Sequence, residues 1–384
     1  MATTPITGAA NGARVEAAPF TADELAPTLR PLLEASLLPS RAYTDGAVAD
    51  WEARNLFLGG WICVGHVSAF AERGQFVTAE VAGESMLFVS GRGFYNVCRH
   101  RGARLLTEPE GTTRRLQCPY HAWTYGFDGT LKNAPHTEEL KDFDPACNGL
   151  REIRTETLGG LVFADPSGRA GPLTDHVGSL AAELERYRTA ELRRGARIDY
   201  DVKANWKAIV ENYSECLHCP GVHPELNRLS HYLTGDDYEG PGAWCGGSMT
   251  LDESAATMAT NGGGPTRPNI AGVDPRVVLY FAIFPNTLIS LHPDYVMLHT
   301  LWPRGAGRTE VVCEWFFEPE TMEREGFDAQ DAVDFWDLVN RQDWHVCELS
   351  QLGLGSAGHT PGRYTEVEGT VHDFDRMVAE AYLR

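Results

Sequence analysis

Two short motifs, Cys98-x-His100 and Cys118-x-x-His121, stand 17 residues apart and offer two thiolates and two imidazoles. Ligands of these types suit either a tetrahedral zinc ion or an iron–sulfur cluster. Zinc motifs usually lie within one small unit, whereas each pair here follows its own β-like run. Two separate loops that clamp one centre are typical of a [2Fe–2S] cluster in which two cysteines bind one iron and two histidines bind the other. We therefore expect these four side chains to hold a [2Fe–2S] cluster.

The sequence around these motifs predicts an all-β domain over residues 56–165. Short runs such as GQFVTAEV and SMLFVSG alternate with glycine-containing turns there, as in compact antiparallel structure. Before this domain, leucines at helical spacing predict an amphipathic helix over residues 22–44. That helix belongs to a leading segment, residues 19–55, which we expect to pack on the second half of the chain. Residues 1–18, rich in Ala, Thr and Gly, predict a disordered arm.

The second half, residues 166–384, predicts an antiparallel sheet with helices packed against it, a helix-grip arrangement. The whole chain is therefore expected to be α+β, with the all-β domain first. The expected elements of the second half are helices near 173–189, 205–218 and 328–352, a strand at 196–203, three β runs within 277–318 and a mobile loop over 242–268.

The segment NYSECLHCPGVH contains a second group of metal-ligand residues. Glu215 and His218 are three apart and would share one face of a helix, and a Pro-Gly turn then brings back His223. Two imidazoles and one carboxylate, with open positions left over, describe the facial triad of non-haem Fe(II) oxygenases. The spacing leaves the carboxylate open, because Glu215 is sterically available and a later helix offers others. Those later candidates are Asp334, Asp337, Asp343 and Glu348.

The charge and the hydropathy of the chain narrow its partners. A net charge of −20 disfavours nucleic acid, which needs a basic surface, and also disfavours anionic membranes. No stretch reaches about 18 apolar residues, and the first residues lack the pattern of a signal peptide, so we expect a cytoplasmic protein. Its nine cysteines are then expected to be thiols or metal ligands instead of disulfides.

At these two groups of residues the chain resembles the Rieske ring-hydroxylating oxygenase alpha subunits, and the resemblance covers most of the chain. It implies that His218, His223 and Asp343 bind a mononuclear Fe(II). It also implies that Glu215 bridges an iron ligand to a cluster-ligating histidine of a neighbouring subunit, and that Asn212 lies near the iron. The resemblance further implies that O2 is the co-substrate and that electrons come from a separate NAD(P)H-dependent flavin/iron–sulfur reductase. It also implies a homotrimer, in which the cluster of one subunit lies close to the iron of its neighbour.

Two positions differ from the respiratory Rieske proteins, which carry an additional disulfide-bonded cysteine on each loop and a serine that hydrogen-bonds the cluster. The corresponding positions here are Ala103 and Tyr120. Fewer hydrogen bonds to a cluster lower its reduction potential, so we expect a cluster suited to donating electrons to an O2-activating iron.

The segments ISLHPDYVMLHTLWP, EVVCEWFFEPE and RQDWHVCELSQ resemble the branch that includes glycine betaine and stachydrine demethylases and carnitine and choline monooxygenases. This resemblance implies hydroxylation, and N-demethylation, of a small quaternary ammonium compound such as glycine betaine or a related betaine. Aromatic faces attract such cations. The aromatic residues expected to line the pocket are Tyr280, Phe281, Phe284, Tyr295 and Trp302. The alternatives are oxidation of an aromatic ring or another hydrophobic C–H group, and an electron carrier without chemistry, which would not need the second group of ligands.

Two further motifs carry less information. GLGSAG at residues 353–358 follows a helix instead of a strand, and no βαβ unit fits after it, so we interpret it as a helix end and loop. Cys216 and Cys219 have C-x-x-C spacing around His218, and we expect both to be buried thiols.

Overall fold

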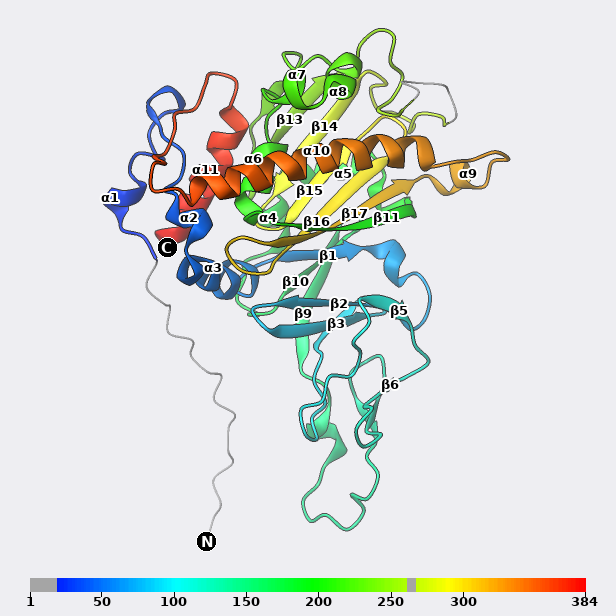
Figure 1. The fold of residues 1–384 in the computed structure, drawn as a ribbon. Helices are drawn as coiled ribbons and strands as arrows, with labels where there is room; N and C mark the ends of the chain where they lie inside the picture. Colours follow the sequence, from blue (N-terminus) through cyan, green and yellow to red (C-terminus); the bar gives the residue numbers. More distant parts are fainter. Residues whose placement is uncertain (1–18, 261–266) are drawn as a thin grey trace.

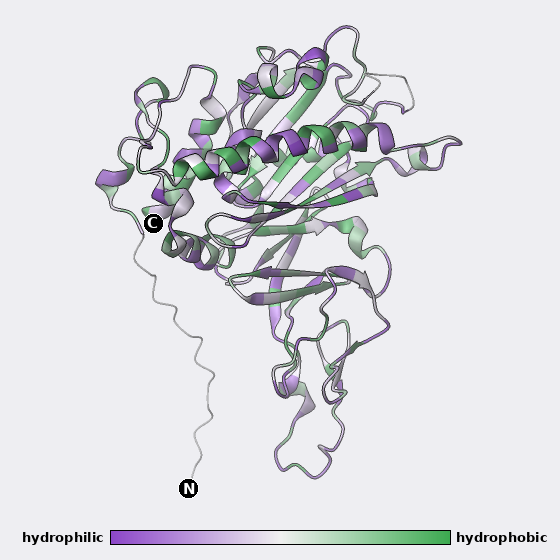
Figure 2. Ribbon diagram, in the orientation of Figure 1, coloured by the Kyte–Doolittle hydropathy of each residue, from purple (hydrophilic) through white to green (hydrophobic). Residues whose placement is uncertain are grey.

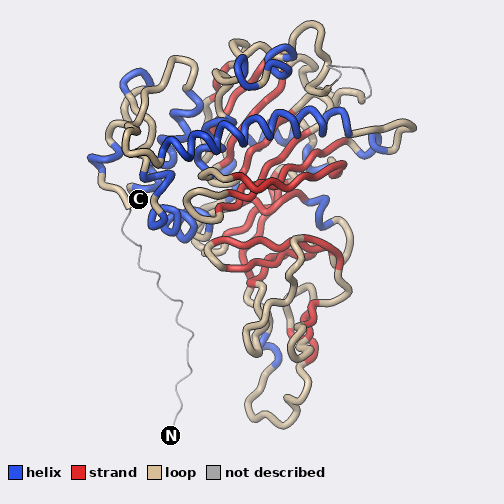
Figure 3. Tube along the Cα trace, in the orientation of Figure 1, coloured by secondary structure: helices blue, strands red, loops and turns tan. Residues whose placement is uncertain are grey.

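A computed structural model describes residues 19–260 and 267–384 of the chain, so the expected arm at residues 1–18 lies outside the described residues. An all-β domain forms the lower part of Figure 1 and joins a larger domain in which helices cover a sheet (Figures 1 and 3). This confirms the α+β class. No helix within the two described ranges is both long enough and apolar enough to cross a membrane.

The β domain is built on one seven-stranded sheet and a small three-stranded sheet at its tip. The strand order of the large sheet is β1 (Ile62–His66), β10 (Leu161–Asp165), β9 (Glu152–Leu158), β4 (Arg92–Tyr95), β3 (Glu84–Val89), β2 (Gln75–Val81) and β5 (Glu110–Thr112). The tip sheet consists of β6 (Leu116–Gln117), β7 (Thr124–Tyr125) and β8 (Leu131–Asn133). Short 3-10 turns η3 (Val67–Phe70) and η4 (Pro145–Asn148) complete it.

The second domain contains a seven-stranded antiparallel sheet. Its order is β11 (Arg193–Val202), β17 (Thr309–Phe317), β16 (Val296–Pro303), β15 (Thr287–Leu291), β14 (Val277–Ile283), β13 (Trp244–Thr250) and β12 (Asp236–Tyr238). Every residue of β15 is buried, because both faces of the sheet are covered. The long helix α10 (Gln330–Leu354) crosses one face, and its apolar stripe is visible in Figure 2.

Alternate residues of β14 belong to different cores, which shows how the two faces are used. Val278 and Ala282 pack with α10 and with α6 (Trp206–Tyr213). Leu279 and Phe281 pack on the other side with α4 (Leu173–Val177) and α5 (Leu180–Arg186). The remaining helices are η5 (Thr189–Glu191), α7 (Cys219–Val222), α8 (Pro224–Leu229), α9 (Pro319–Met322) and α11 (Gly369–Tyr382).

The leading segment does not form the single amphipathic helix predicted over residues 22–44. Pro27, Pro31 and Pro39 interrupt it, since proline lacks the N–H that a helix interior requires. The segment consists of α1 (Ala22–Leu25), η1 (Leu32–Glu34), α2 (Arg41–Thr44), α3 (Gly46–Glu52) and η2 (Ala53–Phe57). One of the leucines in the predicted stripe, Leu33, is 65% exposed.

A buried ion pair ties this leading segment to α6. The Lys207 ammonium lies 2.5 Å from a Glu52 carboxylate oxygen, and both side chains are almost fully buried. The Trp206 indole donates to the same carboxylate at 2.9 Å, and the Tyr382 hydroxyl of α11 donates to it as well. Breaking a buried pair by removing one partner costs about 3–5 kcal/mol, so both chain ends hold α6 in place.

Three expectations for the second half need correction. Residues 277–318 form four strands instead of three, because connections at 284–286, 292–295 and 304–308 separate four runs. Residues 244–250, expected within a mobile loop, form β13, and only residues 261–266 of that stretch lie outside the described part. The helix expected near 173–189 is divided at Gly178. Gly178 has a φ of +56°, which favours glycine, and the Pro241 carbonyl lies too close to leave room for a side chain.

Candidate metal centres and substrate cavity

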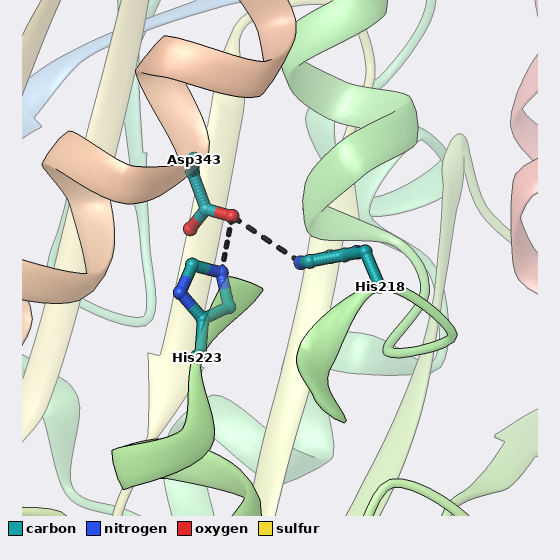
Figure 4. Close-up of side chains that lie close together, drawn as sticks. All are labelled: His218, His223 and Asp343. Carbon is teal, nitrogen blue, oxygen red and sulfur yellow. Dashed lines mark hydrogen bonds and ion pairs between the residues drawn. The ribbon is translucent and has the colours of Figure 1, made fainter. Parts of the chain in front are cut away.

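His218, His223 and Asp343 converge beneath α10, and their ligand atoms all lie within 4.8 Å of one another (Figure 4). One Asp343 carboxylate oxygen lies 2.7 Å from Nε2 of His223 and 3.3 Å from Nε2 of His218. Both imidazoles thus present the same ring nitrogen to one point. Two imidazoles and a carboxylate on one side, with the remaining positions free, fit a mononuclear iron of the facial-triad type.

The opposite ring nitrogen of each histidine is fixed by a second residue. Nδ1 of His218 donates to a Glu215 carboxylate oxygen at 2.5 Å, and Nδ1 of His223 donates to Oε1 of Gln342 at 2.7 Å. These bonds set the tautomer in which Nε2 is free to bind a metal. Gln342 was missed in the sequence, although its place directly before Asp343 on one helix is a usable signal.

Glu215 and His218 meet in a turn and do not share a helix face, contrary to the prediction. Helix α6 ends at Tyr213, and Ser214 caps it by donating its hydroxyl to the Val210 carbonyl. The chain then makes a tight turn in which the Glu215 carboxylate also accepts from backbone N–H groups. Asn212 stays on α6 and borders the same cavity.

The competing carboxylates on α10 are engaged elsewhere. Asp337 accepts hydrogen bonds from the hydroxyl of Tyr200 and from Arg341, and Asp334 accepts from Gln330. The Glu348 carboxylate accepts from the backbone of Lys203. Asp343 is therefore the one of the four candidates that the structure brings to the two histidines.

The charges at this site are strongly coupled. Burial disfavours a charged imidazole at His218, but hydrogen bonds with Asp343 and Glu215 outweigh burial and raise its pKa to about 9. Burial would raise the pKa of Asp343, but its contacts with both histidines lower it below the ordinary value. Since a metal binds the neutral imidazole, iron must displace this proton, and acid conditions weaken the site.

Cys98 and Cys118 lie on two loops of the same construction at the tip of the β domain. In each loop the cysteine N–H donates to the carbonyl five residues on, from Cys98 to Ala103 and from Cys118 to Trp123. In each loop the residue four positions after the cysteine, Gly102 or Ala122, has a positive φ, and its N–H donates to the cysteine carbonyl. The repeated turn points two equivalent pairs of ligands at one centre.

The four side chains of these loops come together in pairs. Both cysteines are buried and interact with each other, and the rings of His100 and His121 lie 4.7 Å apart. Nδ1 of His121 is buried without a hydrogen-bond partner, as expected of a metal ligand. Trp123 stacks on His100 at 4.8 Å and holds its ring in place. One pair of thiols and one pair of imidazoles fit a [2Fe–2S] cluster.

A cavity of about 320 Å³ opens directly onto the three iron-binding candidates. Its wall includes three aromatic side chains with Tyr280 in the middle: the ring of Tyr280 lies 6.0 Å from that of Tyr213 and 6.5 Å from that of Trp336. Tyr232 lines it as well, and Asp236 and Glu366 are among the carboxylates along its exposed side. The volume fits a small organic molecule.

Tyr280 is the one member of the expected aromatic set that the structure brings to this cavity. Phe281 points to the opposite face of the sheet and packs on Trp244, because neighbouring strand residues alternate. Phe284 packs edge-on against Trp206. The Tyr295 hydroxyl donates to the Met258 carbonyl, and Trp302 borders a different cavity between the domains.

Comparison with known proteins decides the family. The profile of "Ring hydroxylating alpha subunit (catalytic domain)" matches residues 189–384, and that of "Rieske [2Fe-2S] domain" matches residues 60–144. The chain is a Rieske oxygenase alpha subunit. It therefore carries a [2Fe–2S] cluster and a mononuclear iron, as the sequence predicted.

Similar proteins extend over most of this Rieske oxygenase. The carnitine monooxygenase oxygenase subunit of Escherichia coli K12 is 37% identical over 345 residues, 85% of this chain and 86% of its own length. The glycine betaine monooxygenase oxygenase subunit of Pseudomonas aeruginosa PAO1 is 28% identical over 366 residues, 86% of this chain and 85% of its own length. The quaternary ammonium Rieske monooxygenase CntA in complex with L-carnitine superposes with a TM-score of 0.76 at 26% identity, over 91% of this chain and 96% of its own. Naphthalene 1,2-dioxygenase from Rhodococcus, at 18% identity and a TM-score of 0.75, shares the fold over 90% of this chain and 94% of its own.

The C-x-x-C pair of this Rieske oxygenase is not a pair of thiols, contrary to the expectation from the sequence. Cys216 and Cys219 form a disulfide across the turn that carries His218. Their Cα atoms are 5.0 Å apart, within the range that a disulfide spans, because the turn after Glu215 folds back on itself. The other seven cysteines, all within the described ranges, form no disulfide, and Cys98 and Cys118 among them are the candidate cluster ligands.

The cluster also receives a hydrogen bond that the sequence comparison with respiratory proteins did not reveal. The Tyr125 hydroxyl lies 3.3 Å from Sγ of Cys98 and accepts from the backbone N–H of Arg99 at 3.0 Å. Hydrogen bonds to cluster sulfurs raise the reduction potential. The expectation of fewer such bonds than in the respiratory proteins stays a prediction, and Tyr125 supplies one of the bonds that this chain does make.

We expect Tyr125→Phe to lower the reduction potential of the cluster on the order of tens of millivolts, since the substitution removes the O–H donor and keeps the ring. An EPR-monitored redox titration measures this shift. Tyr95→Phe is the matched control, because the Tyr95 hydroxyl donates to the Pro166 carbonyl within the same domain. An unchanged or raised potential in Tyr125→Phe would contradict a role for this bond.

We expect Gln342→Leu to weaken binding of the mononuclear iron ~10–100-fold, because the acceptor that orients His223 is lost. Competition with a chelator measures the affinity. Gln330→Leu on the same helix is the control, since Gln330 is exposed and contacts Asp334. Equal affinities in the two variants would mean that Gln342 does not position the ligand.

Proposed function

We propose that this Rieske oxygenase hydroxylates a small quaternary ammonium compound, either at an N-methyl group, which N-demethylates the compound, or at an adjacent C–H group. The cavity beside the iron ligands carries the proposal. It combines aromatic faces with carboxylates, and both attract an organic cation. The named relatives, oxygenase subunits for glycine betaine and carnitine, support the same substrate class.

The proposed roles of the residues follow from their contacts. His218, His223 and Asp343 would hold the iron, which when bound activates O2 beside the substrate. The four loop residues Cys98, His100, Cys118 and His121 would hold the cluster that supplies electrons. Asn212, at the end of α6, would contribute a neutral polar group to the cavity wall next to these ligands.

We further propose a homotrimer in which Glu215 links two subunits. The tip of the β domain and helix α7 lie at opposite ends of one chain (Figure 1), so a cluster on the neighbouring chain would have to reach the iron site. The Glu215 carboxylate binds His218, is 14% exposed and is followed by the exposed Leu217. Its second oxygen would accept a hydrogen bond from His100 or His121 of the neighbour.

The proposed reaction balances with two electrons and two protons. One oxygen atom enters the substrate as hydroxyl and the other leaves as water. A hydroxymethyl group on nitrogen then breaks its C–N bond, releasing formaldehyde, a proton and the demethylated amine. The electrons would come from a separate NAD(P)H-dependent flavin/iron–sulfur reductase in the cytoplasm, since the nucleotide-like GLGSAG motif forms a helix end and turn.

Formaldehyde release from N-methyl cations tests this proposal. The reconstituted oxygenase with a surrogate reductase should consume O2 and release formaldehyde from at least one such compound. Inactivity on every N-methyl cation, together with turnover of an aromatic hydrocarbon, would favour the alternative of ring oxidation. The carboxylates along the cavity disfavour that alternative, because a neutral hydrocarbon offers them neither a charge nor a hydrogen bond.

A further inference from the structure

We propose that the cavity selects substrates of net charge +1, N-methyl cations whose tail ends in a neutral polar group, over zwitterionic betaines with a carboxylate. This inference rests on the proposed function and narrows it. The observation behind it is the distribution of charge in the cavity wall. Glu215, Asp236, Asp237, Asp343 and Glu366 line it, whereas no lysine or arginine does, and every lining residue belongs to the described part of the chain.

Three of these carboxylates are available to a substrate. Asp343 and Glu215 are engaged with the iron-binding histidines. Asp236, Asp237 and Glu366 line the cavity and are solvent-exposed, and Asp237 also accepts a hydrogen bond from the Thr370 hydroxyl at 2.8 Å. Like charges repel the carboxylate of a betaine, while the trimethylammonium group is attracted by all three. The excess of acid in the chain as a whole, a net charge of −20, adds to this preference.

The buried cation behind the aromatic wall does not supply a counter-charge. Arg267 packs over the ring of Tyr295 and is not part of the cavity wall. Its guanidinium lies 3.0 Å from an Asp294 carboxylate oxygen and also pairs with Asp331, so two carboxylates already neutralise it. The buried His292, which stacks on Tyr295, is held uncharged because burial lowers its pKa well below the ordinary value.

One hydroxyl in the aromatic wall lacks a partner. The hydroxyl of Tyr280 is buried and has no hydrogen-bond partner among the described residues. A buried hydroxyl without a partner is unfavourable, so a substrate hydroxyl would satisfy it once the ring turned its hydroxyl toward the cavity. The ring of the same residue stands beside Tyr213 and Trp336, where a trimethylammonium group meets aromatic faces.

Two matched pairs of compounds test the selection for cationic substrates in the purified, metal-loaded oxygenase. Choline and glycine betaine share a trimethylammonium group and differ in a hydroxymethyl against a carboxylate. γ-Butyrobetaine and its methyl ester have a longer tail and differ in a carboxylate against a neutral ester. Anaerobic calorimetry measures binding without turnover, and formaldehyde release measures activity. We expect each cation to bind at least tenfold more tightly than its zwitterionic partner.

Equal or tighter binding of the betaines, with formaldehyde still released, would overturn the charge selection and leave the proposed function intact. Failure of every N-methyl cation to bind or react would remove the proposed function, and this inference with it. The two results are therefore distinguishable.

Neutralising the exposed acids tests the cause. In the double variant Asp236→Asn/Glu366→Gln, choline should bind several-fold more weakly and betaine no more weakly, so the ratio between them narrows. Glu239→Gln removes an exposed carboxylate that directly follows β12 and does not line the cavity, so the ratio should stay as in the parent. An unchanged ratio in the double variant would contradict the role of these carboxylates.

Discussion

Replacing Asp343 by alanine should remove the mononuclear iron and reduce product formation by more than ~100-fold, while the visible spectrum of the [2Fe–2S] cluster stays intact. Loss of a residue that only orients a ligand costs about 10–100-fold, so loss of a direct ligand costs more. The Asp343 carboxylate lies between the two imidazoles, 2.7 and 3.3 Å from their Nε2 atoms. Metal analysis, with inorganic sulfide measured in parallel, separates the two centres.

Asp334→Ala is the matched control for this experiment. Asp334 lies on α10 like Asp343, but its side chain is exposed and accepts a hydrogen bond from Gln330. It should keep both metals and its activity. If Asp343→Ala retained its iron while Asp337→Ala lost it, the assignment of the third ligand would be wrong.

Glu215→Gln should keep both metal centres and lose turnover by about 100-fold or more. The amide oxygen can still accept the Nδ1–H of His218, so the iron ligand keeps its orientation. The negative charge that would attract a cluster histidine of the neighbouring subunit is lost, and an amide forms a weaker bond than a carboxylate. Electron passage between centres, more than metal binding, should therefore be affected.

Stopped-flow absorbance of the pre-reduced oxygenase tests this separation. On mixing with O2 and substrate, the cluster of the parent should reoxidise quickly and that of Glu215→Gln slowly. Glu253→Gln, a change of an exposed carboxylate, should behave like the parent. Loss of iron from Glu215→Gln would instead assign Glu215 to holding His218, and parent-like reoxidation would remove it from the electron route.

The ligands that are close in sequence were predictable, because a short loop or turn is enough to bring them together. Cys98 and His100, or His218 and His223, need only a local reversal of the chain. Asp343 lies about 120 residues beyond His223 and reaches it through the packing of α10 on the sheet. Spacing alone left five candidates for this position, Glu215 and four carboxylates on the later helix, and the resemblance to a family selected among them.

The aromatic wall was harder to predict than the ligands. A strand places neighbours on opposite faces, so a one-residue difference in register decides whether Tyr280 or Phe281 faces the iron. The leucines of residues 22–44 have helical spacing, yet Pro27, Pro31 and Pro39 override it. The only sequence signal for Gln342 is its place directly before Asp343, and its bond to His223 becomes evident only in the folded chain.

The buried ion pair between Glu52 and Lys207 of α6 determines the order in which the two metal sites can fold during synthesis. The loops around Cys98 and Cys118 can close as soon as the first 165 or so residues have left the ribosome, since domains fold as units and the N-terminal one emerges first. The turn with His218 depends on α6, which is anchored through Glu52, and the Glu52 carboxylate in turn accepts a hydrogen bond from Tyr382 of α11. A nascent chain would thus be ready for its cluster well before it could retain the second iron.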